Sequence, residues 1–172
     1  MIKAILATGL NGEIGQNGDM PWGRSLPKDL EYFKKVTLEE IVVMGRKTFE
    51  SLPFKEGLPE RKNIVLSKNS TLAKNPLEGI LGRFVNPYSS GVLDLDKIVW
   101  GKRAFTVIGG ASVYKQMAPL VEEYHITTVY ETYPEADTFF KPDLSNFEKV
   151  GEEIDVGNGE LEATVQVWRR VQ

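Results

Sequence analysis

Asp29 is the side chain of this sequence whose setting most suggests chemistry. If a helix begins near Pro27, the spacing of about 100° per residue places Asp29 on an apolar helix face. The other side chains on that face are Leu26, Leu30 and Phe33. An ionised carboxylate among apolar side chains is costly unless a partner or a ligand uses it. Two interpretations remain: Asp29 stabilises the first helical turn through the helix dipole, or it occupies a dry pocket, binds a ring with adjacent N–H donors and supports proton delivery.

A buried strand that ends at a glycine is followed by two cations and a short helix. The segment reads Gly45, Arg46, Lys47 and Thr48. Backbone N–H groups at a helix N-terminus attract anions, whereas cations are disfavoured there. A bound anion beside Arg46 and Lys47 would resolve this conflict, and broken local rules often mark functional sites. Alternatively, both side chains extend into water.

A second turn between a strand and a helix contains a pair of glycines. Residues 107–112 read Val-Ile-Gly-Gly-Ala-Ser. Glycines let a backbone approach a pyrophosphate closely, although this turn lacks the full G-x-G-x-x-G fingerprint. Two such turns in one chain suit a dinucleotide, and the basic pair at 46–47, with Ser67 and Lys68, favours the phosphorylated form NADP.

The side chains that the sequence lacks exclude several kinds of catalysis. It contains no cysteine, so thiol nucleophiles, disulfides and cysteine-bound metals are excluded. It has no G-x-S-x-G motif and no histidine-rich cluster, and we predict no metal site. The one histidine, His125, falls within an expected strand, which favours a structural role. A chain with so few nucleophiles needs a cofactor for the difficult step, and hydride transfer fits this need.

Charge and hydropathy restrict the partners of the chain. The net charge of −3 argues against nucleic acid, whose binding proteins usually carry a basic excess. No apolar run approaches the roughly 18 residues that a membrane helix needs, and the first residues lack the layout of a signal peptide. We therefore expect a cytoplasmic protein without nucleic-acid or membrane partners.

The elements that must position these residues alternate between strand and helix. With 172 residues, the length favours a single domain over residues 1–172. We expect strands at about 2–8, 41–44, 63–67, near 84, 104–108, 124–133, 148–156 and 161–171. We expect helices at about 27–36, 46–52 and 95–100, and a last helix that follows Gly109-Gly110 and ends at about 117. A long glycine-rich loop covers residues 9–25, and Gly157-Asn158-Gly159 indicates a hairpin. The pattern predicts an α/β fold: a mostly parallel central sheet of about eight strands, helices on both faces and an antiparallel C-terminal hairpin.

Six short motifs, taken in order, resemble those of dihydrofolate reductases. They are Met20-Pro21-Trp22, Asp29-Leu30-x-x-Phe33-Lys34, Met44 to Thr48, Leu58-Pro59-x-Arg61-Lys62-Asn63, Ile108-Gly109-Gly110 and Asp137-Thr138-x-Phe140. The Pro-Trp-Gly-Arg stretch followed by Lys-Asp-Leu is also similar to bacteriophage versions. The chain departs from the family in three ways. It has Glu60 where a glycine is usual, two extra residues between Trp22 and Pro27, and no arginine just before Tyr114.

The resemblance implies an enzyme that reduces 7,8-dihydrofolate to tetrahydrofolate with NADPH and binds antifolates. We take a monomer as the default state. Asp29 would bind the 2-amino group and N3 of the pterin and assist protonation at N5, and Thr127 would support Asp29 through a hydrogen bond. Trp22 would help hold an ordered water. The loop around Met20 would close over the site, and Asp137 would hold that loop from a neighbouring one.

The resemblance also implies a substrate site and a cofactor site. The residues for the substrate would be Ile5, Ala7, Phe33, Lys34, Leu52, Arg61 and Ile108, with Arg61 pairing with the glutamate α-carboxylate of folate. The residues for NADPH would be Ala7, Ile14, Gly45, Arg46, Lys47, Thr48, Ser67, Lys68, Gly109, Gly110, Ala111, Ser112 and Tyr114.

Two other functions would suit the same elements. A pyrimidine reductase of riboflavin synthesis shares the fold, but it would not need Asp29 or the Met-Pro-Trp loop. A non-catalytic nucleotide-binding module would keep the glycines and the basic pair and lose the buried acid.

Overall fold

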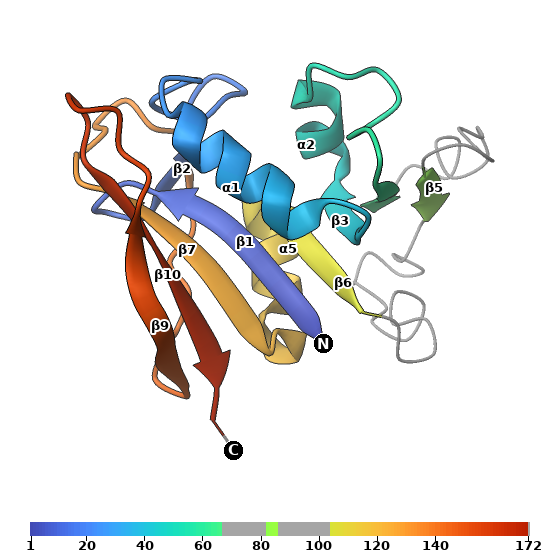
Figure 1. Ribbon diagram of the computed structural model, residues 1–172. Coiled ribbons are helices and arrows are strands. Elements are labelled where there is room, and N and C mark those ends of the chain that lie inside the picture. Colours follow the sequence, from blue (N-terminus) through green and yellow to red (C-terminus); the bar gives the residue numbers. More distant parts are fainter. Residues whose placement is uncertain (67–81, 86–103, 172) are drawn as a thin grey trace.

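An eight-stranded sheet runs through the molecule in the order β5-β4-β3-β6-β1-β7-β10-β9 (Figure 1). The computed structural model describes residues 1–66, 82–85 and 104–171. The strands of this sheet are β1 (Ile2–Thr8), β3 (Ile41–Gly45), β4 (Lys62–Leu66), β5 (Gly82–Val85), β6 (Phe105–Gly109), β7 (Glu123–Val129), β9 (Phe147–Asp155) and β10 (Ala163–Arg170).

The strands from β5 to β7 in this order are parallel, whereas β10 is antiparallel to both of its neighbours. The expected α/β class, the mostly parallel sheet and the antiparallel C-terminal hairpin are therefore confirmed. The strand expected near residue 84 is β5. The helix expected at 95–100 lies outside the described residues.

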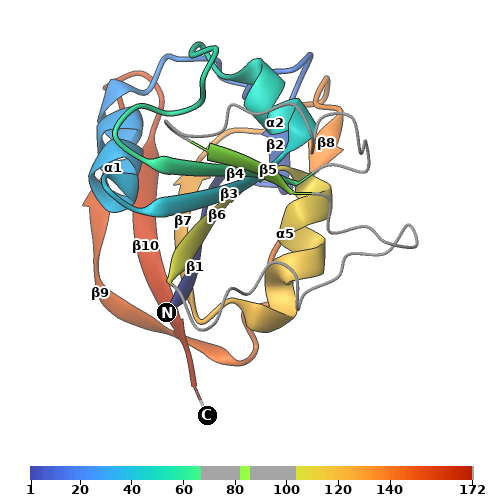
Figure 2. The ribbon, with the colours of Figure 1, turned by 90° about the vertical axis from the view of Figure 1, so that its right-hand side faces the viewer.

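Helices cover both faces of the sheet. Figure 2 shows α1 (Pro27–Thr37) and α5 (Ala111–Met117) on opposite sides of the strands. The 3-10 helix η1 (Ala118–Leu120) continues α5, and the short helix α2 (Arg46–Ser51) follows β3. One apolar cluster lies under α5 and includes Val107 and Met117; a second, beside α1, includes Leu26 and Val165. Among the described residues, no helix has the length and apolar character that crossing a bilayer requires.

Two loops contain short strands that the sequence pattern did not predict. β2 (Glu13–Gly15) pairs antiparallel with β8 (Thr138–Phe139), which joins the loop after β1 to the loop after β7. The strand expected over 124–133 ends at Val129. The β-branched and aromatic pattern continues beyond that point, but Tyr133 packs its ring on Trp22 at a centroid distance of 5.6 Å and donates its backbone N–H to a loop carboxylate.

Candidate active site

A cavity of about 1170 Å³ lies at the carboxyl ends of β1, β3 and β6, between α1, α2 and α5. Ligands of open α/β sheets bind at this edge. The cavity brings together most of the residues that the sequence nominated. Those that line it are Ile5, Ala7, Ile14, Met20, Asp29, Phe33, Lys34, Gly45, Arg46, Lys47, Thr48, Leu52, Arg61, Ile108, Gly109, Gly110, Ala111, Ser112, Tyr114 and Thr127. Trp22 does not line it, and Ser67 and Lys68 lie outside the described residues.

Asp29 is buried in the first turn of α1, with 8% of its surface exposed. Pro27 begins the helix, and the Asp29 backbone N–H donates to the carbonyl of Leu26. The Thr127 hydroxyl donates to Asp29 Oδ1 at 2.6 Å. Burial raises the pKa of Asp29, and the bond from Thr127 opposes part of that rise. The helix dipole does not account for this burial, so the geometry supports the interpretation of Asp29 as an acid in a dry pocket.

Trp22 is buried beside the cavity rather than in its wall. It packs in the apolar cluster with Leu26 and Val129, against the ring of Tyr133. Its indole Nε1 has no hydrogen-bond partner among the described residues. A buried donor without an acceptor is the property that a role in holding an ordered water requires.

Asp137 contacts the long loop over the cavity, as the resemblance implied. The Asn17 backbone N–H donates to Asp137 Oδ2 at 2.9 Å, and the Asp137 backbone N–H donates to the carbonyl of Gly15 at 3.0 Å. The bonds from Asn17 and from the Thr138 hydroxyl hold the pKa of this carboxyl below its usual value. Together with the β2–β8 pairing, these bonds fix the loop at the rim of the cavity.

Glu13 is a structural residue of the same loop that sequence reasoning missed. Only 1% of its surface is exposed, and its carboxylate accepts the backbone N–H groups of Asn11 at 2.5 Å and of Tyr133 at 2.7 Å. It therefore ties the loop after β1 to the loop after β7 from within. An acidic residue in a short glycine-rich stretch looks exposed in a sequence, and no local pattern marks it as buried.

The two glycine turns lie side by side, because β3 and β6 are neighbours in the sheet. Gly109 has φ +131°, and a Cβ there would lie 3.4 Å from the Thr48 hydroxyl; at Gly110 the corresponding distance is 3.3 Å. The Tyr114 hydroxyl donates to the carbonyl of Ile5 at 2.6 Å and ties α5 to β1. A side chain at Gly109 or Gly110 would crowd Thr48. The backbone of both turns borders the cavity, and it suits a pyrophosphate.

The basic pair lies at the rim of the cavity. Arg46 and Lys47 are exposed, and Arg46 Nε lies 3.7 Å from Glu50 Oε1 on the next helical turn. An exposed pair of this kind is weak, so a phosphate can replace it. The residues present fit a phosphorylated dinucleotide such as NADPH.

Arg61 lies at the other end of the cavity and is 7% exposed. Its Nε donates to the carbonyl of Pro59 at 2.8 Å, and Nη1 donates to the Thr37 hydroxyl at 3.1 Å. The Asn63 side chain holds the turn before it, accepting from Leu58 N–H and donating to the carbonyls of Leu58 and Arg61. A guanidinium has five N–H donors, so Arg61 can hold these bonds and still bind a carboxylate.

Glu60, which replaces the glycine usual in the family, adopts a left-handed backbone with φ +59°. This conformation costs a residue with a Cβ roughly 1–2 kcal/mol, whereas glycine adopts it freely at an entropic cost of roughly 0.5–1 kcal/mol. We expect Glu60→Gly to stabilise the fold by about 0.5–1 kcal/mol, measured by urea unfolding.

Glu56→Gly is the matched control for this change. Glu56 is also exposed, but it is not among the residues with positive φ, so the same substitution there should destabilise slightly. A loss of stability for Glu60→Gly would contradict the argument.

Comparison with known proteins points to one family. The family model described as dihydrofolate reductase matches residues 1–170. A dihydrofolate reductase of Bacillus subtilis is 37% identical over 153 residues, covering 89% of this chain and 83% of that protein. A dihydrofolate reductase of Haemophilus influenzae is 38% identical over 154 residues, covering 88% and 84%.

A solved structure gives the same result at the level of the fold. The dihydrofolate reductase from Enterococcus faecalis, complexed with NADP(H) and RAB-propyl, has a TM-score of 0.80 and 30% sequence identity. The match covers 100% of this chain and 97% of that one.

Proposed function

This chain belongs to the dihydrofolate reductase family, and we propose that Asp29 is the residue through which it assists proton delivery to the substrate. The enzyme reduces 7,8-dihydrofolate to tetrahydrofolate with NADPH. The proposed role of Asp29 rests on one observation: a buried carboxyl group, bonded to Thr127, faces the cavity that the two glycine turns also line.

The Asp29 carboxylate keeps acceptor capacity beyond its bond from Thr127. Oδ1 accepts from Thr127 and keeps a second lone pair, so Oδ1 and Oδ2 together can accept from the adjacent 2-amino and N3–H donors of a pterin. Bound there, Asp29 orients the ring and places a negative charge beside it, which stabilises the cation that forms as N5 gains a proton. Because burial raises its pKa, the carboxyl group holds a proton to higher pH than an exposed aspartate does.

The cofactor supplies the hydride, and other residues of the cavity would bind the cofactor and orient the pterin. When NADPH is bound, it supplies the hydride that is added to C6 of the pterin. The turn from Gly109 to Ser112 would hold its pyrophosphate. Thr48 would lie at its adenosine end, where Arg46 and Lys47 would bind the 2′-phosphate. The walls around Ile5 and Phe33 orient the pterin ring and exclude water. Antifolates that carry the same donor edge would occupy the same cavity.

The two alternative functions have less support. The comparisons offer nothing in favour of a pyrimidine reductase. A non-catalytic module does not need the buried Asp29–Thr127 pair. We propose a monomer, and light scattering of the purified protein tests this. We propose that the enzyme is cytoplasmic.

The proposed 2′-phosphate contact predicts a change in cofactor preference. Arg46→Ala should raise the KM for NADPH about tenfold, the lower end of what a hydrogen bond to a charged group contributes, and leave the KM for NADH nearly unchanged. Steady-state rates with each cofactor measure this. Lys115→Ala is the control, because Lys115 is an exposed cation on α5 that does not line the cavity. Equal effects of Arg46→Ala on both cofactors would exclude the contact.

A further inference from the structure

A second polar link joins α1 to β7 beside the one that holds Asp29. The Tyr32 hydroxyl lies 2.6 Å from Nδ1 of His125. Tyr32 follows Asp29 by three residues, about one turn along the same helix face. His125 precedes Thr127 by two residues, on the same face of the strand. The two links, Asp29–Thr127 and Tyr32–His125, therefore join the same helix and strand, one helical turn apart on α1 and two residues apart on β7.

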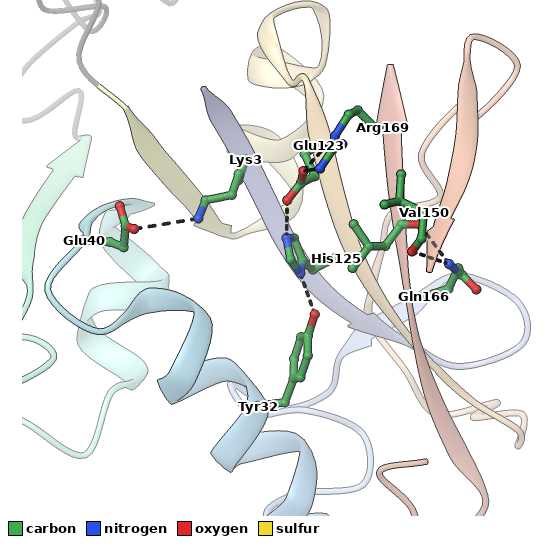
Figure 3. Close-up of polar contacts among 9 residues, drawn as sticks. Lys3, Tyr32, Glu40, Glu123, His125, Val150, Gln166 and Arg169 are labelled. Carbon is green, nitrogen blue, oxygen red and sulfur yellow. Dashed lines mark hydrogen bonds and ion pairs between the residues drawn. The ribbon is translucent and has the colours of Figure 1, made fainter. Parts of the chain in front are cut away.

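The second link continues across the sheet to β10. His125 Nε2 lies 2.7 Å from Glu123 Oε1, and Arg169 Nη2 donates to Glu123 Oε2 at 2.9 Å. Figure 3 shows this row, from Tyr32 on α1 through His125 and Glu123 to Arg169. Four side chains from three elements thus form one continuous set of hydrogen bonds.

The charge of Glu123 fixes the direction of every bond in the row. Burial opposes its ionisation, but the bonds from Arg169 and His125 hold the pKa of Glu123 below its usual value, so it is an acceptor only. His125 must then donate from Nε2. Burial lowers the pKa of His125, so Nδ1 carries no proton at neutral pH and accepts from Tyr32. Burial and the nearby charges of Glu123 and Asp29 raise the pKa of Tyr32 to about 12, which keeps its hydroxyl a donor.

The row is buried in the sheet, and Tyr32 on α1 is half-buried. His125 and Glu123 are buried, like Asp29 and Thr127. The charged groups that face the pair Tyr32–His125 are Lys3 from β1, Glu123 from β7, Arg169 from β10 and Asp29 from α1. A single link would let α1 turn about the Asp29–Thr127 bond, whereas two links fix its rotation against β7.

We propose that Tyr32, held by His125 and Glu123, is a positioning residue that keeps the Asp29 carboxyl group turned into the cavity. This inference rests on the proposed role of Asp29. Tyr32 does not line the cavity, and it acts through the helix that carries the acid.

Tyr32→Phe removes the hydroxyl and keeps the ring. We expect kcat for dihydrofolate to fall roughly fivefold at neutral pH, the factor that one ordinary hydrogen bond corresponds to, with the KM for NADPH unchanged. The midpoint of the pH profile of kcat should move to lower pH, because a looser α1 admits water and lowers the cost of ionising Asp29.

Two variants serve as controls. His125→Gln keeps the row, because an amide oxygen can accept from Tyr32 while the amide N–H donates to Glu123. This variant should therefore retain a kcat close to that of the parent enzyme. Tyr130→Phe removes a hydroxyl that lies 3.0 Å from that of Thr164, and Tyr130 is exposed, just beyond the end of β7, and does not line the cavity. It should leave kcat and its pH profile unchanged.

A double-mutant cycle decides whether Tyr32 acts through Asp29. In the Asp29→Asn background, Tyr32→Phe should have no further effect on kcat. An equal loss in both backgrounds overturns the proposal, as does a Tyr32→Phe enzyme that melts earlier but keeps the parent kcat and pH profile. Parent turnover in Asp29→Asn alone would refute the role of Asp29 itself and with it the positioning. If Asp29→Asn lowers turnover but Tyr32→Phe causes an equal loss in both backgrounds, only the positioning role of Tyr32 is refuted.

Discussion

Asp29→Asn is expected to lower turnover at neutral pH by roughly 10²–10⁴-fold, the range typical of lost acid–base assistance. The amide oxygen can still accept from Thr127, so the shape of the site is kept, but the side chain can no longer hold a proton or a negative charge. The loss of NADPH absorbance with dihydrofolate measures the rate. Turnover near that of the parent enzyme would reject the assignment.

The same substitution is expected to stabilise the protein. Because burial raises the pKa of Asp29, the folded carboxyl group binds a proton more tightly than the unfolded one. The free energy of unfolding therefore falls as pH rises from the unfolded pKa to the folded pKa, and it stays lower above the folded pKa. Asparagine has no such cost, so Asp29→Asn should melt at a higher temperature than the parent at neutral pH.

Asp143→Asn provides the opposite case. Bonds from Ser145 lower the pKa of this exposed aspartate, so its contribution to stability is present above the unfolded pKa and lost as pH falls. Its replacement should not raise the melting temperature. An Asp29→Asn enzyme that melts earlier than the parent at neutral pH would contradict the argument from burial.

Arg61→Gln is expected to raise the KM for dihydrofolate about 100-fold, since removing one partner of a buried, hydrogen-bonded charge pair costs about 2–5 kcal/mol. The loss should fall on KM more than on kcat, because the carboxylate contact is made equally in the ground state and the transition state. Arg61→Lys keeps the charge but loses the planar pair of donors, so its KM for dihydrofolate should lie between those of the parent enzyme and Arg61→Gln. Steady-state kinetics measure both constants.

A dihydropterin without the glutamate portion separates this role from a structural one. Arg61 also donates to Pro59 and Thr37, so its replacement could disturb the cavity wall. If the carboxylate contact is its main role, Arg61→Gln should reduce the shortened substrate as well as the parent does. An equal loss on both substrates would assign Arg61 to the structure of the wall alone.

Much of the fold could be predicted because its strands are buried on both faces. Such strands are continuous apolar runs, and β1, β3 and β6 are visible as runs that end at glycine or threonine. The strands β2 and β8 could not be predicted, because three and two residues are too few to show a period. The expected strand after Tyr124 was too long, since the aromatic Tyr133 packs on Trp22 and not in the sheet.

The site was predicted where its chemistry depends on local spacing. Asp29 was visible from its helix face, and the two turns from their glycines. Trp22 lies behind the cavity wall, and its predicted role of holding an ordered water stays a prediction. The Tyr32–His125 link could not be predicted. It depends on the register in which α1 packs on β7, and neither residue has a neighbour in sequence that marks it.

The central place of β1 has a consequence for how the chain is made. Ile2 of β1 pairs with Phe105 of β6, and Lys3 pairs with Glu123 of β7. At about 5–20 residues per second, a ribosome takes seconds to produce those partners after β1 has emerged. During that time an apolar strand with two unpaired edges is exposed on the nascent polypeptide. The high contact order of this arrangement predicts slow folding after synthesis and a need for chaperones at high rates of expression.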